Sequence, residues 1–293
     1  MTRGQRGNLL TGIAFISPWV IGFAVFTAVP IGLSLYYSFC DYALTAPSRA
    51  PLWIGLDNYR QMMHDALFWK SLVNTLYYAA MAVPAGLVVS LGLALLLDRP
   101  VRGQAIYRAL VFLPALVPAI AAAVIWLWMF ESRLGLINFL LGKIGIPGPN
   151  WLGESLAMPS LALMSLWSVG NTVVIFLAGL QETPRELLEA AQIDGAGPLR
   201  RLGSVILPAL APVIFFNLII GIIAAFSILT VPFMMTQGGP NNATYFYTMY
   251  SYDQAFHFLH MGYASALAWV QLVVILALTG VAFWIASKWV HDG

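Results

Sequence analysis

The chain has 293 residues, of which 60% are hydrophobic and only 9% are charged. Soluble domains have about 25% charged residues, so this composition excludes a soluble globule and a disordered chain. The net charge of +2 provides no strongly basic surface for nucleic acid. A single cysteine, Cys40, excludes an intrachain disulfide and a metal site built from cysteines. The remaining class is an integral membrane protein.

Six windows of the sequence contain no charged residue and no histidine. Each is long enough for a helix to cross a hydrocarbon core, which takes about 20 residues. The windows are continuously apolar, whereas strands of a membrane barrel alternate in stretches of about ten residues. We therefore predict an all-α membrane protein in which residues 1–293 form one transmembrane domain of six helices. The windows are 9–39, 71–97, 109–130, 158–180, 205–234 and 263–287.

The first window follows two arginines, as the apolar part of a signal peptide does. It is far longer than an apolar region of about 7 to 15 residues, and no clear cleavage site follows it. We expect a retained helix that bends or breaks at Pro18 or Pro30.

The loops differ in their content of Lys and Arg. Segments 1–8, 98–108, 181–204 and 288–293 have 9 in 49 residues, whereas segments 40–70, 131–157 and 235–262 have 5 in 86 residues. The positive-inside rule places the first set in the cytoplasm together with both termini, and the second set outside.

The spans lack the groups that would power transport within this chain. Without an intramembrane charge, a proton or sodium relay is disfavoured, and no phosphate-binding G-x-x-x-x-G-K-[ST] loop is present. His257 and His260 share a loop with only one nearby carboxylate, Asp253, so loop histidines are favoured over a metal site. An energy source would therefore lie in another chain.

The polar residues inside the spans are uncharged. They can line a path for a polar, uncharged solute, or they can bond neighbouring helices, and the sequence leaves both interpretations open. These residues are Asn74, Asn171, Asn217, Ser227, Thr230 and Gln271.

The loop 181–204 predicts a short helix between spans four and five. Thr183 and Glu186 have the spacing of a capping box, and Pro184 suits the first helical position. Gly195 predicts the end of the helix, and Pro198 predicts the start of a second one. The stretch 186–194 has three acids and no base, which favours docking on a protein over lying on an anionic membrane surface.

The same loop resembles a known family. Residues 189–196 read Glu-Ala-Ala-Gln-Ile-Asp-Gly-Ala and residues 205–208 read Val-Ile-Leu-Pro. This is similar to the E-A-A loop of ABC-importer permeases, except that Leu202 stands where Phe is usual. Further segments resemble the carbohydrate-uptake class, on the side of the maltose-type first permease subunit: residues 53–59, 74–75, 112–114, 238–240 and 262–266.

The resemblance implies a type I ABC importer permease fold in a prokaryotic cytoplasmic (inner) membrane. It implies a complex with a second, homologous permease, two ABC ATPase subunits that bind ATP and Mg, and an extracytoplasmic solute-binding protein that delivers a sugar or oligosaccharide. This chain itself would bind no cofactor and would not be an enzyme. The residues that it implies for coupling to the ATPases are Glu189, Ala190, Ala191, Asp194, Gly195, Ala196 and Leu202.

Two further sets of candidates follow. Rings stack on sugar faces and neutral polar groups bond hydroxyls, so we expect the substrate path among Trp167, Asn171, Phe216, Asn217, Thr230 and Met234. Trp167 and Asn171 are spaced i,i+4 and would share a helix face; helix packing remains an equally open interpretation for each residue. For the binding protein we expect contact at Gly238, Gly239 and Pro240.

Three alternatives remain. An ion-coupled secondary transporter is disfavoured by the uncharged spans and by the E-A-A loop. An intramembrane enzyme would need a catalytic constellation that is absent from the spans. An ABC importer for a non-carbohydrate solute is the more serious alternative.

Overall fold

The computed structural model describes residues 3–45 and 50–291. These residues form two compact units. Of the described residues, the first unit comprises 3–45, 50–65 and 251–272, and the second comprises 66–250 and 273–291.

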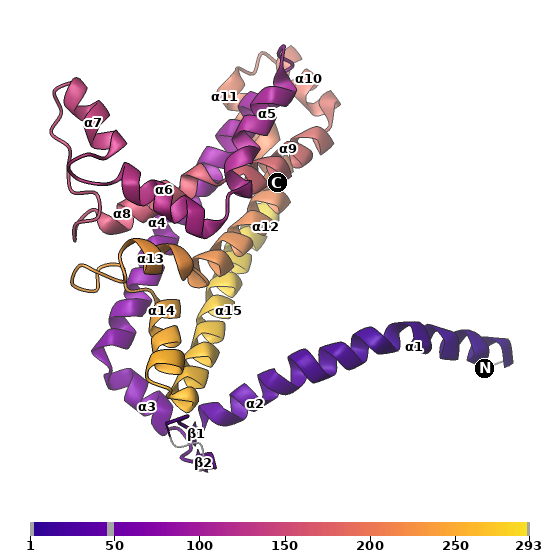
Figure 1. Cartoon of the computed structure of the whole chain (residues 1–293). Helices are drawn as coiled ribbons and strands as arrows, with labels where there is room; N and C mark the ends of the chain where they lie inside the picture. Colours follow the sequence, from indigo (N-terminus) through magenta and orange to yellow (C-terminus); the bar gives the residue numbers. More distant parts are fainter. Residues whose placement is uncertain (1–2, 46–49, 292–293) are drawn as a thin grey trace. The chain divides into compact units, whose positions relative to one another are not determined.

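The first unit begins with a long apolar helical segment. It consists of α1 (Arg3–Phe23), the π-helical turn η1 (Ala24–Ala28) and α2 (Val29–Ser38), which follow one another without interruption (Figure 1). The irregular turn lies just before Pro30, whose ring removes the backbone donor that an α-helix would use there. The bend expected from the prolines is therefore a π-helical turn, and the helix does not break.

A small two-stranded hairpin follows, which the prediction of helices did not include; the described chain is otherwise mostly helical. Strands β1 (Cys40–Asp41) and β2 (Leu52–Trp53) are antiparallel, with Cys40 opposite Trp53. The side chain of Asn58, on α3 (Asp57–His64), donates to the carbonyl oxygens of Ser38 and Cys40 at 2.9 and 3.0 Å. A side-chain amide therefore stabilises the hairpin, a tertiary contact that strand propensity does not reveal.

The second unit is built on two long helices, α4 (Ala66–Leu97) and α12 (Leu207–Phe226). A third helix, α15 (Met261–His291), ends in this unit. The core lies where α4 packs against α8, α9 and α12. Gly179 and Gly221 let these helices approach closely, because a Cβ at either position would lie 2.8 Å from a neighbouring side chain.

Two expected spans are each divided into a pair of helices. Helix α5 (Gln104–Phe112) and the 3-10 turn η2 (Leu113–Leu116) meet α6 (Ala119–Met129) at an angle of 98°. Pro118 makes the preceding residue extended, and Val117 has ψ of 128°. Helices α8 (Ala157–Trp167) and α9 (Gly170–Glu182) meet at 51°.

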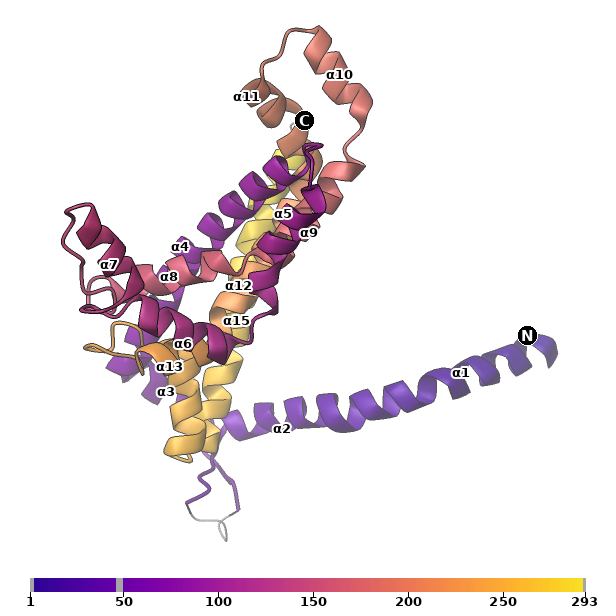
Figure 2. The ribbon, with the colours of Figure 1, turned by 45° about the horizontal axis from the view of Figure 1, so that its top comes forward.

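Short elements fill the segments between the long helices. The described residues include α7 (Leu136–Lys143), α13 (Thr230–Met235), α14 (Tyr247–Tyr252) and η4 (Asp253–His257). At one end of the second unit, beyond α9, lie α10 (Arg185–Ile193) and α11 (Pro198–Arg201), followed by η3 (Leu202–Ile206) (Figures 1 and 2).

By length and composition, four helical segments of the described chain can cross a membrane: Gly12–Ser38, Ala66–Leu97, Pro198–Phe226 and Met261–Ile285. The number rises to six if each bent pair is one span.

Candidate functional site

A cavity of about 300 Å³ lies in the second unit between α4, α12 and the joint of α8 with α9. None of its lining residues is charged. Its polar lining consists of hydroxyl groups and one amide, which hydrogen-bond neutral donors and acceptors. The residues that provide them are Tyr78, Ser90, Ser165, Ser168, Thr172 and Asn217.

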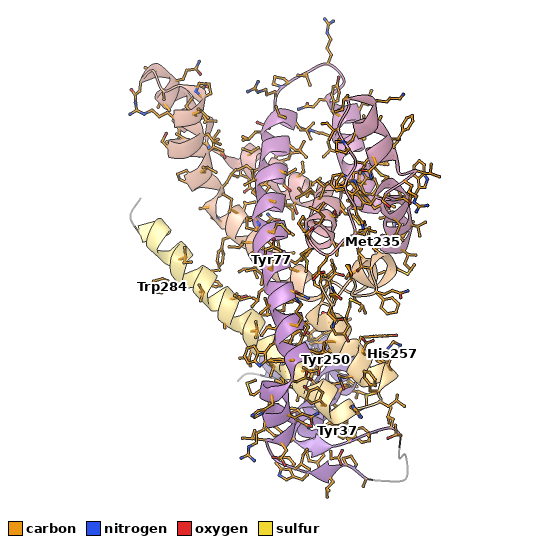
Figure 3. The ribbon with its side chains drawn as sticks, turned by 90° about the vertical axis from the view of Figure 1, so that its left-hand side faces the viewer. Tyr37, Tyr77, Met235, Tyr250, His257 and Trp284 are labelled. Carbon is orange, nitrogen blue, oxygen red and sulfur yellow. The ribbon has the colours of Figure 1, made fainter. Side chains whose placement is uncertain are left out.

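Neighbouring tyrosines of α4 have opposite environments. Tyr78 is 4% exposed, lines the cavity and shares a side-chain hydrogen bond with Ser165. Tyr77, the preceding residue of α4, is 54% exposed and is not among the lining residues of the cavity (Figure 3 labels its position). Tyr78 therefore has its phenol group in the cavity wall, and Tyr77 has the same group outside the cavity, where it can serve as a control.

Ser90 has an unsatisfied hydroxyl group in the cavity wall. The residue is fully buried, and its Oγ has no hydrogen-bond partner within the described part of the chain. Leaving a buried polar group unpaired costs about 1–3 kcal/mol, so this hydroxyl suits a polar solute or water. Sequence analysis missed Ser90 because serine is common at helix interfaces, and only the cavity distinguishes it.

The structure brings one of the six predicted path residues into this cavity. Asn217 is 5% exposed, and its amide donates to the carbonyl of Val213 at 2.8 Å. Trp167 packs against the adjacent core cluster, with its ring 6.2 Å from that of Trp126. The other four are exposed on the second unit: Asn171, Phe216, Thr230 and Met234.

The expectation that Trp167 and Asn171 share one helix face is wrong. The helix ends at Trp167 and restarts at Gly170, so the i,i+4 relation does not hold across the joint. Ser168 donates its backbone N–H to the carbonyl of Ser165 at 3.2 Å, which closes the last turn of α8.

The predicted short helix in the loop 181–204 is present as α10. It begins at Arg185 and lacks the capping box, because the Thr183 hydroxyl donates to the carbonyl of Gly179 in α9 at 3.3 Å. Its end is as predicted: Gly195 has φ of +75°, and Ala196 donates its N–H to the carbonyl of Ala191 at 2.9 Å. The second helix starts at Pro198, also as predicted.

The surface of α10 and α11 combines acidic and apolar groups. Glu189, Ala190, Asp194 and Gly195 are exposed, whereas Ala191, Ala196 and Leu202 are half-buried. Two apolar side chains project nearly free of the chain: Ile193 is 87% exposed and Leu199 is 84% exposed. The α10–α11 surface therefore presents both acidic and apolar side chains to its surroundings.

The predicted binding-protein contacts lie in a tightly folded loop. Gly238 is buried, and a Cβ there would lie 2.7 Å from the ring of Tyr245, so this glycine shapes the loop. Gly239 is half-buried and Pro240 is exposed. Exposed Asn241 donates its side-chain amide to Glu154 at 2.8 Å, which ties the loop to the segment before α8.

Two side chains of helix α4 form hydrogen bonds with the same loop and the residues that follow it. The Asn74 amide donates to the carbonyl oxygens of Asn242 and Tyr245 at 2.7 and 3.1 Å. The hydroxyl of Thr75 accepts the backbone N–H of Tyr247 at 2.9 Å. Asn74 and Thr75 therefore form a loop clamp, which the sequence did not predict because their partners lie about 170 positions further along the chain.

Among residues 3–45 and 50–291, no three side chains of His, Cys, Asp or Glu come together as metal ligands. The candidate functional features are thus the uncharged cavity, the exposed α10–α11 surface and the clamped loop, in a chain whose apolar helices are long enough to span a bilayer. Together they define a multi-pass membrane transport protein.

Comparison with known proteins agrees with this class. Residues 82–291 match the family described as binding-protein-dependent transport system inner membrane component, and the chain belongs to this family. The resemblance seen in the sequence is thereby confirmed: the chain is an ABC transporter permease and not an enzyme.

Similar proteins cover nearly the whole chain. The probable ABC transporter permease protein YesP of Bacillus subtilis (strain 168) is 41% identical over 99% of this chain and 94% of its own length. The sulfoquinovosyl glycerol transport system permease protein SmoG of Agrobacterium fabrum is 34% identical, over 94% of this chain and 90% of its own.

The fold is also found among solved structures. A chain from the crystal structure of a bacterial alginate ABC transporter, in complex with alginate pentasaccharide-bound periplasmic protein, has a TM-score of 0.81. It is 21% identical, and the match covers 98% of this chain and 96% of that one.

Proposed function

We propose that this permease translocates a sugar or oligosaccharide into the cell in an ATP-driven importer. The observation that carries the proposal is the uncharged cavity, whose hydroxyl and amide groups suit a polyhydroxylated solute. The names of the relatives support it, since SmoG is named for sulfoquinovosyl glycerol and the solved structure for alginate.

A second candidate substrate class is supported by another relative. The sn-glycerol-3-phosphate transport system permease protein UgpA of Yersinia enterocolitica is 36% identical over 89% of this chain. Since the cavity lining is uncharged, this chain would contact either solute through hydrogen bonds and apolar surface.

In the proposed complex the chain has six spans, with each bent pair counted as one, and both termini in the cytoplasm. It pairs with a second, homologous permease, and two ABC ATPase subunits that bind ATP and Mg lie below them. The excess of Lys and Arg in segments 1–8, 98–108, 181–204 and 288–293 supports this orientation.

Helix α10 would be the coupling helix. Glu189, Asp194, Ile193 and Leu199 are exposed at the end of the second unit that this orientation places in the cytoplasm. When ATP closes the two ATPases, α10 would move with them and carry the bundle from an inward-open to an outward-open state. ATP and the delivered solute then bias the same two-state element.

The clamped loop on the opposite side would contact the solute-binding protein. Pro240 and Asn241 are exposed there, and the hydrogen bonds to Asn74 and Glu154 hold the loop in one conformation. A preformed loop loses less conformational entropy on binding.

The test is uptake by the assembled transporter in proteoliposomes with its binding protein and a panel of labelled solutes. We expect ATP-dependent uptake of a sugar or oligosaccharide that persists when an ionophore removes ion gradients. Uptake of glycerol phosphate alone would replace the sugar with the second substrate class, and uptake that needs an ion gradient but no ATP would refute the proposal.

A further inference from the structure

A second pocket, a groove of about 250 Å³, lies between α4, α5 and α9. The residues that line its two ends differ in chemistry. One end has the side chains of Arg108, in the middle of α5, and Gln181, near the end of α9. The rest is apolar, with Val111, Val174 and Leu177 among its lining residues. A groove of this kind fits an amphipathic ligand with a polar head and an apolar tail.

The guanidinium of Arg108 has unused hydrogen-bonding capacity. One nitrogen, Nη2, donates to the carbonyl of Leu97 at 3.1 Å, but the Gln104 amide already donates to that carbonyl at 2.7 Å. The Nε of Arg108 is buried and has no partner, and no carboxylate of the described residues forms an ion pair with this side chain. An anionic oxygen would therefore satisfy both the charge and the unpaired N–H.

The groove has the length of one lipid leaflet. From Gly170 to Gln181, α9 rises about 16 Å, which is close to half of a hydrocarbon core about 30 Å thick. The groove closes at Gly170, where a Cβ would lie 2.9 Å from the Cα of Phe112. An acyl chain that enters at the polar end would therefore finish near the middle of the bilayer.

The charges near the polar end of the groove favour an anionic lipid head group. The segment 98–108 has three arginines, at positions 99, 102 and 108, and one acid, Asp98. In the orientation proposed above, this end faces the cytoplasmic leaflet, where basic pockets between transmembrane helices bind anionic head groups.

We propose that this groove binds an anionic phospholipid from the cytoplasmic leaflet. Its phosphate accepts hydrogen bonds from Arg108 and Gln181, and one acyl chain lies along Val174 and Leu177. The inference rests on the proposed orientation and is independent of the transported solute.

The test measures phosphatidylglycerol retained by the assembled transporter, purified in mild detergent, by native mass spectrometry. We expect Arg108→Gln to lower the retained lipid about fivefold, which corresponds to about 1 kcal/mol for one basic residue near an anionic head group. Arg108→Lys keeps the charge and should retain more lipid than Arg108→Gln. Arg102→Gln is the matched control, because Arg102 is exposed in the same segment and outside the groove.

A second variant, Val174→Trp, fills the apolar part and leaves Arg108 in place. It should also lower lipid retention, and it decides the question if Arg108→Gln does not assemble. Equal retention by Arg108→Gln and Arg102→Gln would overturn the proposal, as would a Val174→Cys variant that crosslinks to another subunit but not to a thiol-reactive phosphatidylglycerol. Because the readout is bound lipid, failure here leaves the proposed sugar uptake intact.

Discussion

The amide of Asn74 in α4 donates to the backbone carbonyl of Asn242 at 2.7 Å, and so links positions 168 residues apart. Both residues of the loop clamp, Asn74 and Thr75, are buried, and both bond backbone groups of the segment 242–247. The conformation of the proposed binding-protein contact is thus controlled from a transmembrane helix.

The loop clamp can be tested with matched substitutions. Asn74→Leu removes the side-chain donor to the carbonyls of Asn242 and Tyr245, and Thr75→Val removes the hydroxyl that accepts the Tyr247 N–H. Each lost hydrogen bond costs the loop about 1 kcal/mol. We expect the binding protein to bind these variants about tenfold more weakly, with basal ATP hydrolysis retained. Thr75→Ser keeps the hydroxyl and should bind normally; unchanged affinity in both Asn74→Leu and Thr75→Val would show that the loop is not the contact.

Gly195 provides a test of the coupling helix. Gly195→Trp should abolish ATP-driven uptake, because the indole would block the proposed contact with the ATPase. The permease should remain in the membrane, since Gly195 is exposed and a Cβ there meets nothing within 4 Å in this chain. Gly195→Asn is the control for backbone strain at the positive φ of this position, because asparagine tolerates that conformation better than other non-glycine residues and its side chain is smaller than that of tryptophan. Normal uptake by Gly195→Trp in proteoliposomes of the whole complex would contradict the coupling role.

The exposed apolar side chains of the α10–α11 surface give a separate prediction. Ile193→Asp and Leu199→Asp should weaken copurification of the ATPase subunits by about tenfold or more, because a carboxylate would replace an apolar contact. Ile144, 70% exposed outside this surface, is the control position. If Ile193→Asp and Ile144→Asp copurify the ATPases equally, the surface does not dock them.

The cavity is tested by the tyrosine pair. Tyr78→Phe removes a hydroxyl from the cavity wall, and we expect the KM for the solute to rise about three- to tenfold, the loss of one hydrogen bond of about 1 kcal/mol. Tyr77→Phe, the same change on the exposed face, should leave KM unchanged. Similar values for the two variants would place the path elsewhere.

The earlier path candidates remain predictions with their own test. Trp167→Ala and Asn171→Ala now probe different environments, a core cluster and an exposed position. If neither changes transport or solute-stimulated ATP hydrolysis, these residues do not line the pathway.

Sequence patterns predicted the features that depend on local chemistry. Charge-free windows located the apolar helices, Gly195 marked the end of α10, and Pro198 marked the start of α11. Patterns did not predict features that depend on tertiary contacts. Thr183 bonds α9 instead of capping α10, Asn58 stabilises a hairpin, and the role of Ser90 depends on a cavity.

The joints of the two bent helix pairs meet at a single point. A Cβ on Gly170, the first residue of α9, would lie 2.9 Å from the Cα of Phe112, the last residue of α5, so the two backbones are in contact there. Any side chain larger than hydrogen at position 170 would therefore push α5 and α9 apart at this contact. The glycine at position 170 thus sets how closely the two bent helix pairs can approach each other.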